Sequence, residues 1–526
     1  MIKLKMEPEA PPRQRRRRLG WLLVLLLLVP VVALVSERWR GQSALKAWKR
    51  QMAAKGEIFD ARQLWPPPSP ESLEFSNRLA LAVAQLPPGL GKYGSSLSGM
   101  VPVQPGQARR SSQEPKPLLR PLADGSNSWE DLGACMHLAQ APLESLRSLM
   151  QSPPSGLEYN VNETLETDSI PNYVNTRCGA QALNAAVLQD LHVRNLEAAR
   201  ADLTALSGYV RLREEDPTLV CFMIRIAILG LSVDAYWDAL QAEGWTELQL
   251  AALQQASRCE KLPSEMSRSL VAERVWRIHQ LYWFRSHSYR EWVGKYSEFY
   301  QSFGMSLPRS ETAGMVGLWR QWVFHPIWSF AWADQEQLSY LHTVQEDIET
   351  LRSGAEQGSW IGLRQQMAAS HRNYRSPAAS WRFYTTLPLV DRFSEIIGSS
   401  PIPAPIYPYP DFSRAWLTTM KNLTLNQMVS TVIALKRYEL RHGELPSTLT
   451  ALVPEFLPGV PHDYMDGQPL RYRVNRDASF TLYSVGENAV DDAGDPSPAD
   501  LPRSGELVGP WTGRDWVWPR VVTLAR

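Results

Sequence analysis

An uncharged run near the N-terminus constrains this chain more than any other feature. Leu19 to Val35 (LGWLLVLLLLVPVVALV) contains seventeen residues without a charge, directly after the basic block Arg15 to Arg18. As a helix this run would span ~25 Å, slightly less than the hydrocarbon core of a bilayer, and Trp21 and Trp39 could lie at its two interfaces. Pro30 does not forbid a helix in a membrane. We therefore expect a transmembrane helix over residues 19–35.

The basic residues around this run predict its orientation. Seven Lys or Arg precede it and six follow within twenty residues, and the upstream charges lie closer to it. The positive-inside rule then places the N-terminus in the cytoplasm and the bulk of the chain in the periplasm, as a single-pass protein of a bacterial inner membrane. A cleaved signal peptide is the alternative. Ala33-Leu34-Val35 matches a cleavage site poorly, which favours an uncleaved signal anchor.

Proline clusters divide the rest of the 526 residues. Many of the forty prolines lie between Pro66 and Pro121 or within SSPIPAPIYPYP (Ser399 to Pro410), a composition typical of tethers and linkers. Trp511, Trp516 and Trp518 predict that the C-terminal tail packs back onto a domain. We expect these segments: a basic cytoplasmic arm (1–18), the transmembrane helix (19–35), a juxtamembrane helix and Pro-rich tether (36–128), a helical body (129–398), a Pro-rich linker (399–412), a small α+β module (413–495) and the tail (496–526).

The apolar periodicity of the body predicts a mainly α fold. Residues 178–193 (CGAQALNAAVLQDLHV) and 196–212 (LEAARADLTALSGYVRL) are two amphipathic runs joined by a short link. Such a pair is similar to a tetratricopeptide-type hairpin. Because no second copy follows at a fixed period, we expect a helical bundle or an irregular α-solenoid.

One apolar run in the body contains a charge. Leu219 to Ser232 is fourteen residues long and includes Arg225. The run is too short to cross a bilayer, so we expect a core helix. Arg225 would then need an acidic partner, for which Asp216 and Asp234 are candidates.

A second run in the body is rich in aromatic residues. Gly314 to Ala333 (GMVGLWRQWVFHPIWSFAWA) also contains polar residues that the centre of a membrane helix tolerates poorly. We expect a buried helix that is broken before Pro326. The alternative is an aromatic face that dips into a membrane or contacts a ligand.

Charge and cysteine spacing exclude several classes of protein. The formal net charge of +1 gives no overall field that would attract nucleic acid. None of the four cysteines lies in a C-x-x-C pair, so neither a zinc site nor a thioredoxin-like motif is expected. We expect them to be small buried hydrophobic residues, with disulfides an alternative outside the cytoplasm: Cys135, Cys178, Cys221 and Cys259.

The C-terminal module has the signals of a helix followed by a hairpin. Leu425 to Arg441 has helical spacing of apolar residues, and Gly443 can end that helix in the left-handed conformation. A short helix is expected near Pro446. Two strands are expected at Leu470 to Val474 and Phe480 to Val485, after a turn at Asp466-Gly467.

The ordered string RY…HG…LVP…VP.D…G.PLRYR…F.LYSVG.N..DD.G resembles the globular part of type II secretion major pseudopilins over roughly 70 residues. The resemblance implies a fold for this module but no activity. The chain departs from a pilus subunit because no G-F-x-x-x-E processing pattern precedes Leu19 and about 390 residues separate anchor and module. The whole layout also resembles a bacterial family of uncharacterised single-span membrane proteins, through AKGEIFDARQLWPPPSP and DPTLVCFMIRIAILGLSVDA, which implies location and architecture.

The pseudopilin resemblance also implies a metal. Major pseudopilins bind calcium in the loop that corresponds to Asp491, Asp492 and the backbone carbonyl of Ser484, and Asp495 follows closely. Clustered carboxylate and carbonyl oxygens suit calcium, which would be structural here. The spacing is not that of an EF-hand, and Ala493 stands where a Gly would be typical. A solvated acidic turn is the alternative.

No catalytic motif is evident, so we hypothesise a non-enzymatic, membrane-anchored scaffold of the cell envelope that binds an unidentified protein, with secretion machinery as one option. A second hypothesis is an envelope hydrolase or transferase whose groups meet only in the fold, for example His279, His325, Glu273 and Asp334. A third is a component of the pseudopilus.

Overall fold

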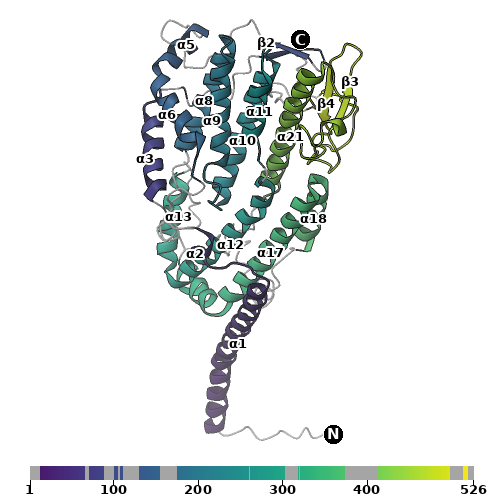
Figure 1. Cartoon of the computed structure of the whole chain (residues 1–526). Helices are drawn as coiled ribbons and strands as arrows, with labels where there is room; N and C mark the ends of the chain where they lie inside the picture. Colours follow the sequence, from purple (N-terminus) through teal and green to yellow (C-terminus); the bar gives the residue numbers. More distant parts are fainter. Residues whose placement is uncertain are drawn as a thin grey trace. The chain divides into compact units, whose positions relative to one another are not determined.

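The computed structural model describes the backbone of residues 12–65, 70–87, 90, 100–104, 107–110, 129–154, 174–259, 261–302, 318, 320–373, 412–497 and 513–518. These residues are mainly helical, which confirms the expected mainly α class (Figure 1). The chain divides into two compact units. Unit 1 comprises Met1–Phe59, Arg274–Gln345 and Asn373–Pro410, and unit 2 comprises Asp60–Glu273, Glu346–Arg372 and Asp411–Arg526.

Unit 1 begins with one long helix. α1 (Pro12–Ala54) has 43 residues and continues through Pro30 without a break, so the expected transmembrane and juxtamembrane helices are a single element. Beyond the expected anchor, α1 has a buried stripe at helical spacing: Gly41, Leu45, Trp48 and Met52. Gly41 is needed for this packing, because a Cβ added there would lie 2.8 Å from Cγ of Gln335.

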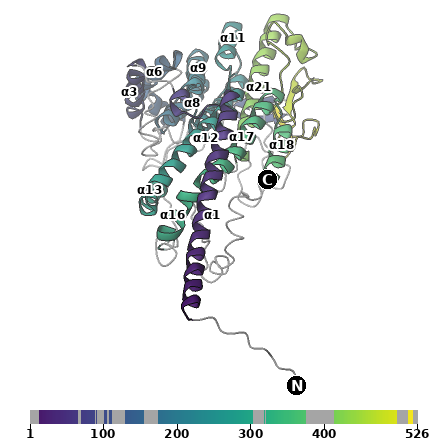
Figure 2. The same cartoon turned by 90° about the horizontal axis from the view of Figure 1, so that it is seen from below.

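The remaining helices of unit 1 surround an aromatic cluster. Its buried members are Phe284, Tyr289, Trp292, Phe324, Trp328 and Ala333. They come from the last turns of α12 (Leu262–Ser286), α13 (Tyr289–Ser302), the π-helical turns η1 (Arg320–Phe324) and η2 (Trp328–Trp332), which flank α16 (His325–Ile327), and the start of α17 (Ala333–Gln357). η2 also packs against α1 (Figure 2).

The expected break before Pro326 is wrong. The chain stays helical from Arg320 to Gln357, and one π turn lies on each side of the proline. A proline lacks the N–H that an α-helix requires at that position, and wider turns accommodate the change without ending the helix. The expectation of a wholly buried helix is also wrong. Phe324 and Trp328 are buried, whereas Trp322 and Phe330 are exposed.

Unit 2 contains the helical body. Its elements are α2 (Ala61–Leu64), α3 (Pro70–Ala84), β1 (Met100–Gln104), β2 (Gln107–Arg110), α5 (Trp129–Leu138), α6 (Gln140–Gln151), α8 (Val174–His192), α9 (Leu196–Arg211), α10 (Leu219–Gln241), α11 (Glu247–Ala256), the first part of α12 and, after the return of the chain from unit 1, the end of α17, α18 (Trp360–Asn373) and α21 (Ser413–His442). The expected pair of helices joined by a short link is confirmed as α8 and α9, and the Asn195 side chain caps α9 by accepting from the Ala198 N–H at 3.2 Å.

α10 has the composition of a membrane helix but is largely covered. Among the described residues it is the helix that is long and apolar enough to cross a bilayer, and 61% of its most apolar window is buried inside the protein. This burial supports the expected core helix. The partner of Arg225 is Glu265, at 2.5 Å, rather than Asp216 or Asp234, because the charge meets α12 and not its own neighbourhood in the sequence. Arg225 also donates to the Val210 carbonyl at 2.7 Å.

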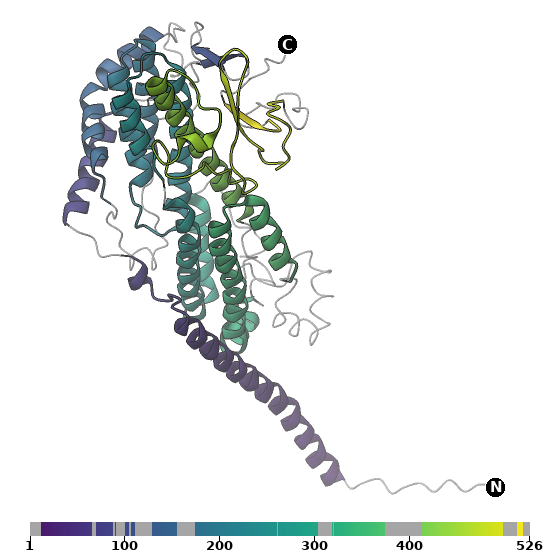
Figure 3. The same cartoon turned by 45° about the vertical axis from the view of Figure 1, so that its right-hand side comes forward.

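The C-terminal module is built on α21, which packs against α10 and α11. The helix begins twelve residues before the expected start and ends, as expected, at Gly443, whose φ is +78°. The expected hairpin is confirmed as β3 (Arg471–Val474) and β4 (Phe480–Ser484), and the expected short helix is the 3-10 turn Leu449–Leu452. Figure 3 shows these strands in yellow beside α21.

The C-terminal tail completes this small sheet. β5 (Trp516–Trp518) pairs antiparallel with β4, which gives the order β3-β4-β5. Trp516 and Trp518 are each 2% exposed. The expectation that the tail packs back onto a domain is therefore confirmed for these two residues, and Trp511 lies outside the described residues.

Candidate functional site

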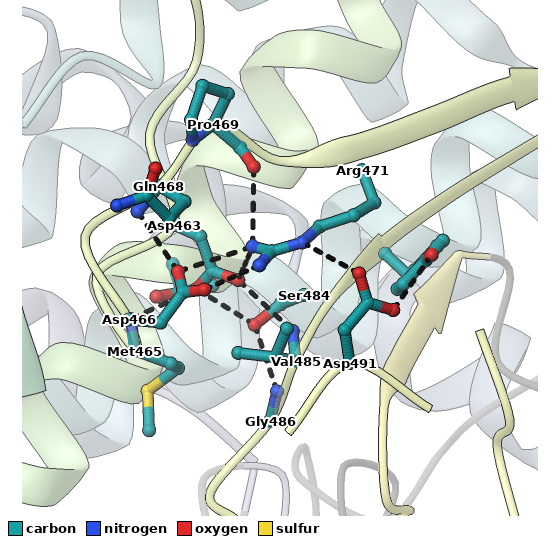
Figure 4. A network of polar contacts seen from close by, with 12 residues as sticks. Asp463, Met465, Asp466, Gln468, Pro469, Arg471, Ser484, Val485, Gly486 and Asp491 are labelled. Atoms are coloured by element: carbon teal, nitrogen blue, oxygen red, sulfur yellow. Dashed lines mark hydrogen bonds and ion pairs between the residues drawn. The ribbon is translucent and has the colours of Figure 1, made fainter. Parts of the chain in front are cut away.

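A buried carboxylate organises the C-terminal module. Asp463 is 0% exposed and lies in the loop that leads into β3. It accepts hydrogen bonds from the Met465 N–H at 3.0 Å, the Ser484 hydroxyl at 2.9 Å and the Val485 N–H at 3.1 Å (Figure 4). Burial raises the pKa of Asp463, and the two backbone N–H groups oppose that rise. The side chain thus fastens the loop to the end of β4.

Arg471 joins this carboxylate to two others. Its guanidinium lies 3.2 Å from Asp463, 2.5 Å from Asp466 and 3.4 Å from Asp491 (Figure 4). Of these partners, Asp491 is the most exposed, at 47% of its side chain, and Asp463 is fully enclosed. Arg471 therefore connects the interior of the module to the acidic turn at its surface.

The Asp463 loop also rests on the start of α18. The N–H groups of Trp360 and Ile361 donate to the carbonyls of Tyr464 and Met465 at 2.7 and 3.3 Å. The free N–H groups at a helix start are satisfied in this way by the loop. One loop therefore contacts α18, α21 and both strands of the hairpin, since the Thr424 hydroxyl of α21 accepts from the Tyr464 N–H at 3.1 Å.

Each carboxylate of the predicted calcium loop has partners of its own. Asp491 accepts from the Tyr483 hydroxyl at 3.1 Å and the Ala493 N–H at 3.0 Å. Asp492 accepts from the side-chain amide of Asn488 at 3.0 Å. Partial burial raises the pKa of Asp491, but hydrogen bonds and Arg471 outweigh this and hold it below its usual value.

Asp495, the third predicted ligand, closes a local turn. Its two oxygens accept from the Ser497 N–H at 2.9 Å and the Ser497 hydroxyl at 2.7 Å. These bonds hold the pKa of Asp495 below its usual value. The side chain is therefore engaged within its own turn and not with the other two carboxylates.

A fourth carboxylate, Asp515, accepts hydrogen bonds from the backbone of the acidic turn. The N–H groups of Asp492, Gly494 and Asp495 point at it, at 3.4, 2.6 and 3.2 Å, and Asp515 is 1% exposed. Ala493 adopts a φ of +60°, the conformation that normally favours the Gly absent here. No residue spacing pointed to Asp515, because it lies in the C-terminal tail and reaches the turn only in the fold.

The side chains as placed do not fit a calcium ion. The turn directs N–H donors inward onto Asp515, and a guanidinium already neutralises Asp491. Over the described part of the chain, no three His, Cys, Asp or Glu side chains converge in a way that could hold a metal ion. Calcium binding by Asp491, Asp492 and Asp495 therefore stays a prediction from the resemblance, and no chemistry is derived from it.

Two candidates for a hydrolase site have structural partners in unit 1. His325 shares a hydrogen bond of 3.0 Å with the Phe284 carbonyl, and burial lowers the pKa of its imidazole. Asp334 forms an ion pair with Arg285 at 2.8 Å. Both side chains fix the aromatic cluster to its helices, which is a packing role. Glu273 and His279 both lie on α12 and are half-buried.

A buried pair of carboxyl groups in unit 2 was not predicted. Asp202 is 0% exposed and accepts from Arg147 at 2.6 and 3.0 Å. Asp190 is half-buried beside it, and burial and this neighbouring carboxyl group raise the pKa of Asp190 to about 8. Burial raises the pKa of Asp202 as well, and its bonds to Arg147 oppose that rise, so Asp190 is the group expected to keep a proton at neutral pH. The three residues come from different helices, and no local pattern connects them.

This pair predicts a dependence of stability on pH. The folded-state pKa of Asp190 is raised above its usual 3.8 to about 8, so its contribution is fully present below about pH 4 and is lost as the pH rises through 8. Over that window we expect the free energy of unfolding to fall by up to about 1.4 kcal/mol per pH unit. Asp190→Asn should flatten this slope in urea titrations of the purified protein. An unchanged slope would show that the two carboxyl groups do not share a proton.

No known family model matches the chain, and neither a curated protein nor a solved structure does. The geometry of the described residues therefore carries the functional argument.

Proposed function

We propose that this chain is a non-enzymatic, membrane-anchored scaffold of the bacterial cell envelope. One observation carries the proposal: α1 is a single helix with two different surroundings. Leu28, Val29, Val31, Val32 and Val35 are each about half exposed or more, whereas the stripe that follows is packed into unit 1. Exposed valine and leucine side chains at this density on one helix suit lipid and not water.

The part of α1 that follows Val35 is packed into unit 1. Gln335 donates to the Glu37 carbonyl at 2.9 Å, and Arg40 donates to Gln335 at 3.2 Å. Trp48 stacks edge-on with Phe59 at 5.7 Å. A cleaved signal peptide ending at Val35 would leave this packing in place, so the uncleaved anchor rests on the exposed apolar residues and on the poor cleavage site.

The C-terminal module supports the interaction role. Its helix, left-handed glycine cap, 3-10 turn and hairpin follow the order that the pseudopilin resemblance implies. The packing of α21 on α10 and α11 fastens the module to the other helices of unit 2. We infer that the module presents a fixed surface to a protein partner in the periplasm and does not polymerise as a pilus subunit.

The test is carbonate extraction of membranes combined with protease treatment of spheroplasts. The intact chain should stay in the membrane pellet, and protease should digest its bulk from outside. Leu28→Arg/Val32→Arg should move a large share of the chain to the soluble fraction, because a central arginine costs about 2.5–3.5 kcal/mol in a membrane helix.

The matched control is Ser43→Arg/Ala47→Arg, which adds the same charges to exposed positions of α1 beyond the anchor. This variant should remain in the pellet. Extraction of the unmodified chain by carbonate, or bulk protected from protease in spheroplasts, would refute the proposal.

A further inference from the structure

A second apolar surface lies next to the anchor in unit 1. Trp322 is 69% exposed, Val323 43% and Phe330 42%, and Pro326 is exposed between them. Trp322, Pro326 and Phe330 are four residues apart, which places them about one turn apart on the π and α turns of this segment. We call these three residues with Val323 the outer stripe.

The helix cannot bury the outer stripe by rotating about its axis, because its opposite side is already buried. The opposite side already supplies Phe324, Trp328 and Ala331 to buried positions. The segment is therefore apolar on both sides. The inner side is covered by protein, whereas the outer stripe is exposed, and a contiguous exposed apolar surface of this kind marks a contact with a protein or a membrane.

Direct contacts fix the outer stripe beside the point where α1 leaves the expected anchor. Arg38 donates to the Phe330 carbonyl at 3.3 Å, and its guanidinium lies 4.8 Å above the Phe330 ring. Arg38 is three residues past Val35, about 5 Å along the helix. Phe330 is therefore held at the level where the hydrocarbon core would end.

The composition near Phe330 suits that depth. Trp39, one residue past Arg38, is 73% exposed. Tryptophan concentrates at membrane interfaces because its ring is apolar and its N–H is polar, and an arginine at this level can contact lipid phosphates.

We propose that the outer stripe lies in the headgroup and upper acyl region of the same bilayer that holds α1. The inference rests on the proposed membrane anchoring. The bilayer then contacts unit 1 at two elements that are far apart in sequence, the helix α1 and the segment η1–η2. Two such contacts restrict the tilt of α1 and the rotation of unit 1 about it, which a single spanning helix does not do.

The test places an environment-sensitive fluorophore on single introduced cysteines of the full-length protein. The chain is reconstituted into vesicles of phosphatidylcholine and phosphatidylglycerol that contain spin-labelled lipid. Labelled positions are Val32→Cys in the anchor, Trp322→Cys and Phe330→Cys in the outer stripe, and Ala54→Cys as the control. Signal from the native cysteines is measured on the unmodified chain and subtracted.

Ala54 is a matched control because it is exposed on the same helix, nineteen residues past Val35, about 29 Å away. We expect lipid quenching at residues 322 and 330 to exceed that at residue 54 by roughly twofold or more, with the strongest effect from a quencher near the headgroup.

Quenching at residue 32 but not at 322 or 330 would overturn this inference and leave the anchor intact. Absence of quenching at residue 32 as well would overturn the anchor and the inference together. Blue-shifted emission at 322 without lipid quenching would show that a protein surface, such as a second copy, covers the stripe, and this also overturns the inference.

Discussion

Asp463→Ala is expected to lower the free energy of unfolding of the C-terminal module by about 3–5 kcal/mol, because it removes one partner of a buried ion pair. The change leaves the hydroxyl of Ser484 and the N–H of Val485 without their acceptor in a region closed to water. It also leaves Arg471 with one fewer counter-charge. The effect combines a weakened ion pair with unsatisfied donors, and an unsatisfied donor is costly when buried.

Hydrogen exchange of peptides that cover residues 461–474 and 480–486 measures this effect locally. Asp491→Ala is the matched control, because it removes a carboxylate from the same arginine at a site 47% exposed. Exposed ion pairs contribute about 1 kcal/mol or less, so the control should change protection little. Equal effects from the two variants would mean that Asp463 does not organise the module.

The parts of the fold that depend on neighbours in sequence were predictable. The pair α8 and α9 follows from apolar spacing, and the hairpin β3 and β4 from alternating residues on either side of a turn. α21 ends at Gly443 because glycine has no Cβ and takes a φ of +78° without strain. In each case the deciding interactions lie within a few residues.

The features of the fold that the sequence did not predict depend on residues far apart in the chain. Glu265 lies forty residues from Arg225, so no local rule would choose it over Asp216. Asp515 reaches the acidic turn from the tail, and the turn's three N–H donors are explained only by its presence. The continuity of the helix through Pro326 depends on π turns, which no residue pattern specifies. The resemblance pointed to the acidic turn, whereas the residues that bond to it, Arg471 and Asp515, are evident only in the folded structure.

A buried arginine holds the end of α1 against other helices of unit 1. Arg274 of α12 lies 3.0 Å from Glu57 and donates to the Ile58 carbonyl at 2.8 Å, just past the end of α1. It also donates to Gln345 of α17, and its guanidinium lies 4.6 Å from the Phe59 ring centre. The Arg274 and Glu57 side chains are 0% and 4% exposed. These contacts hold the residues just after α1 against α12 and α17.

Arg274→Met should therefore lower the unfolding free energy of unit 1 by about 3–5 kcal/mol, because a methionine fills the space but leaves the Glu57 carboxylate buried and unpaired. Adding Glu57→Gln should restore much of the loss, since the double variant has no uncompensated charge. Arg277→Met on the same helix is the control, because Arg277 is only half-buried and its loss should cost about 1 kcal/mol or less. Hydrogen exchange over residues 48–59 and 274–286 reports the change.

If Glu57→Gln failed to rescue the Arg274→Met variant, the loss of stability would come from lost packing around Phe59. The ion pair would then not be the interaction that holds α1 to the rest of unit 1.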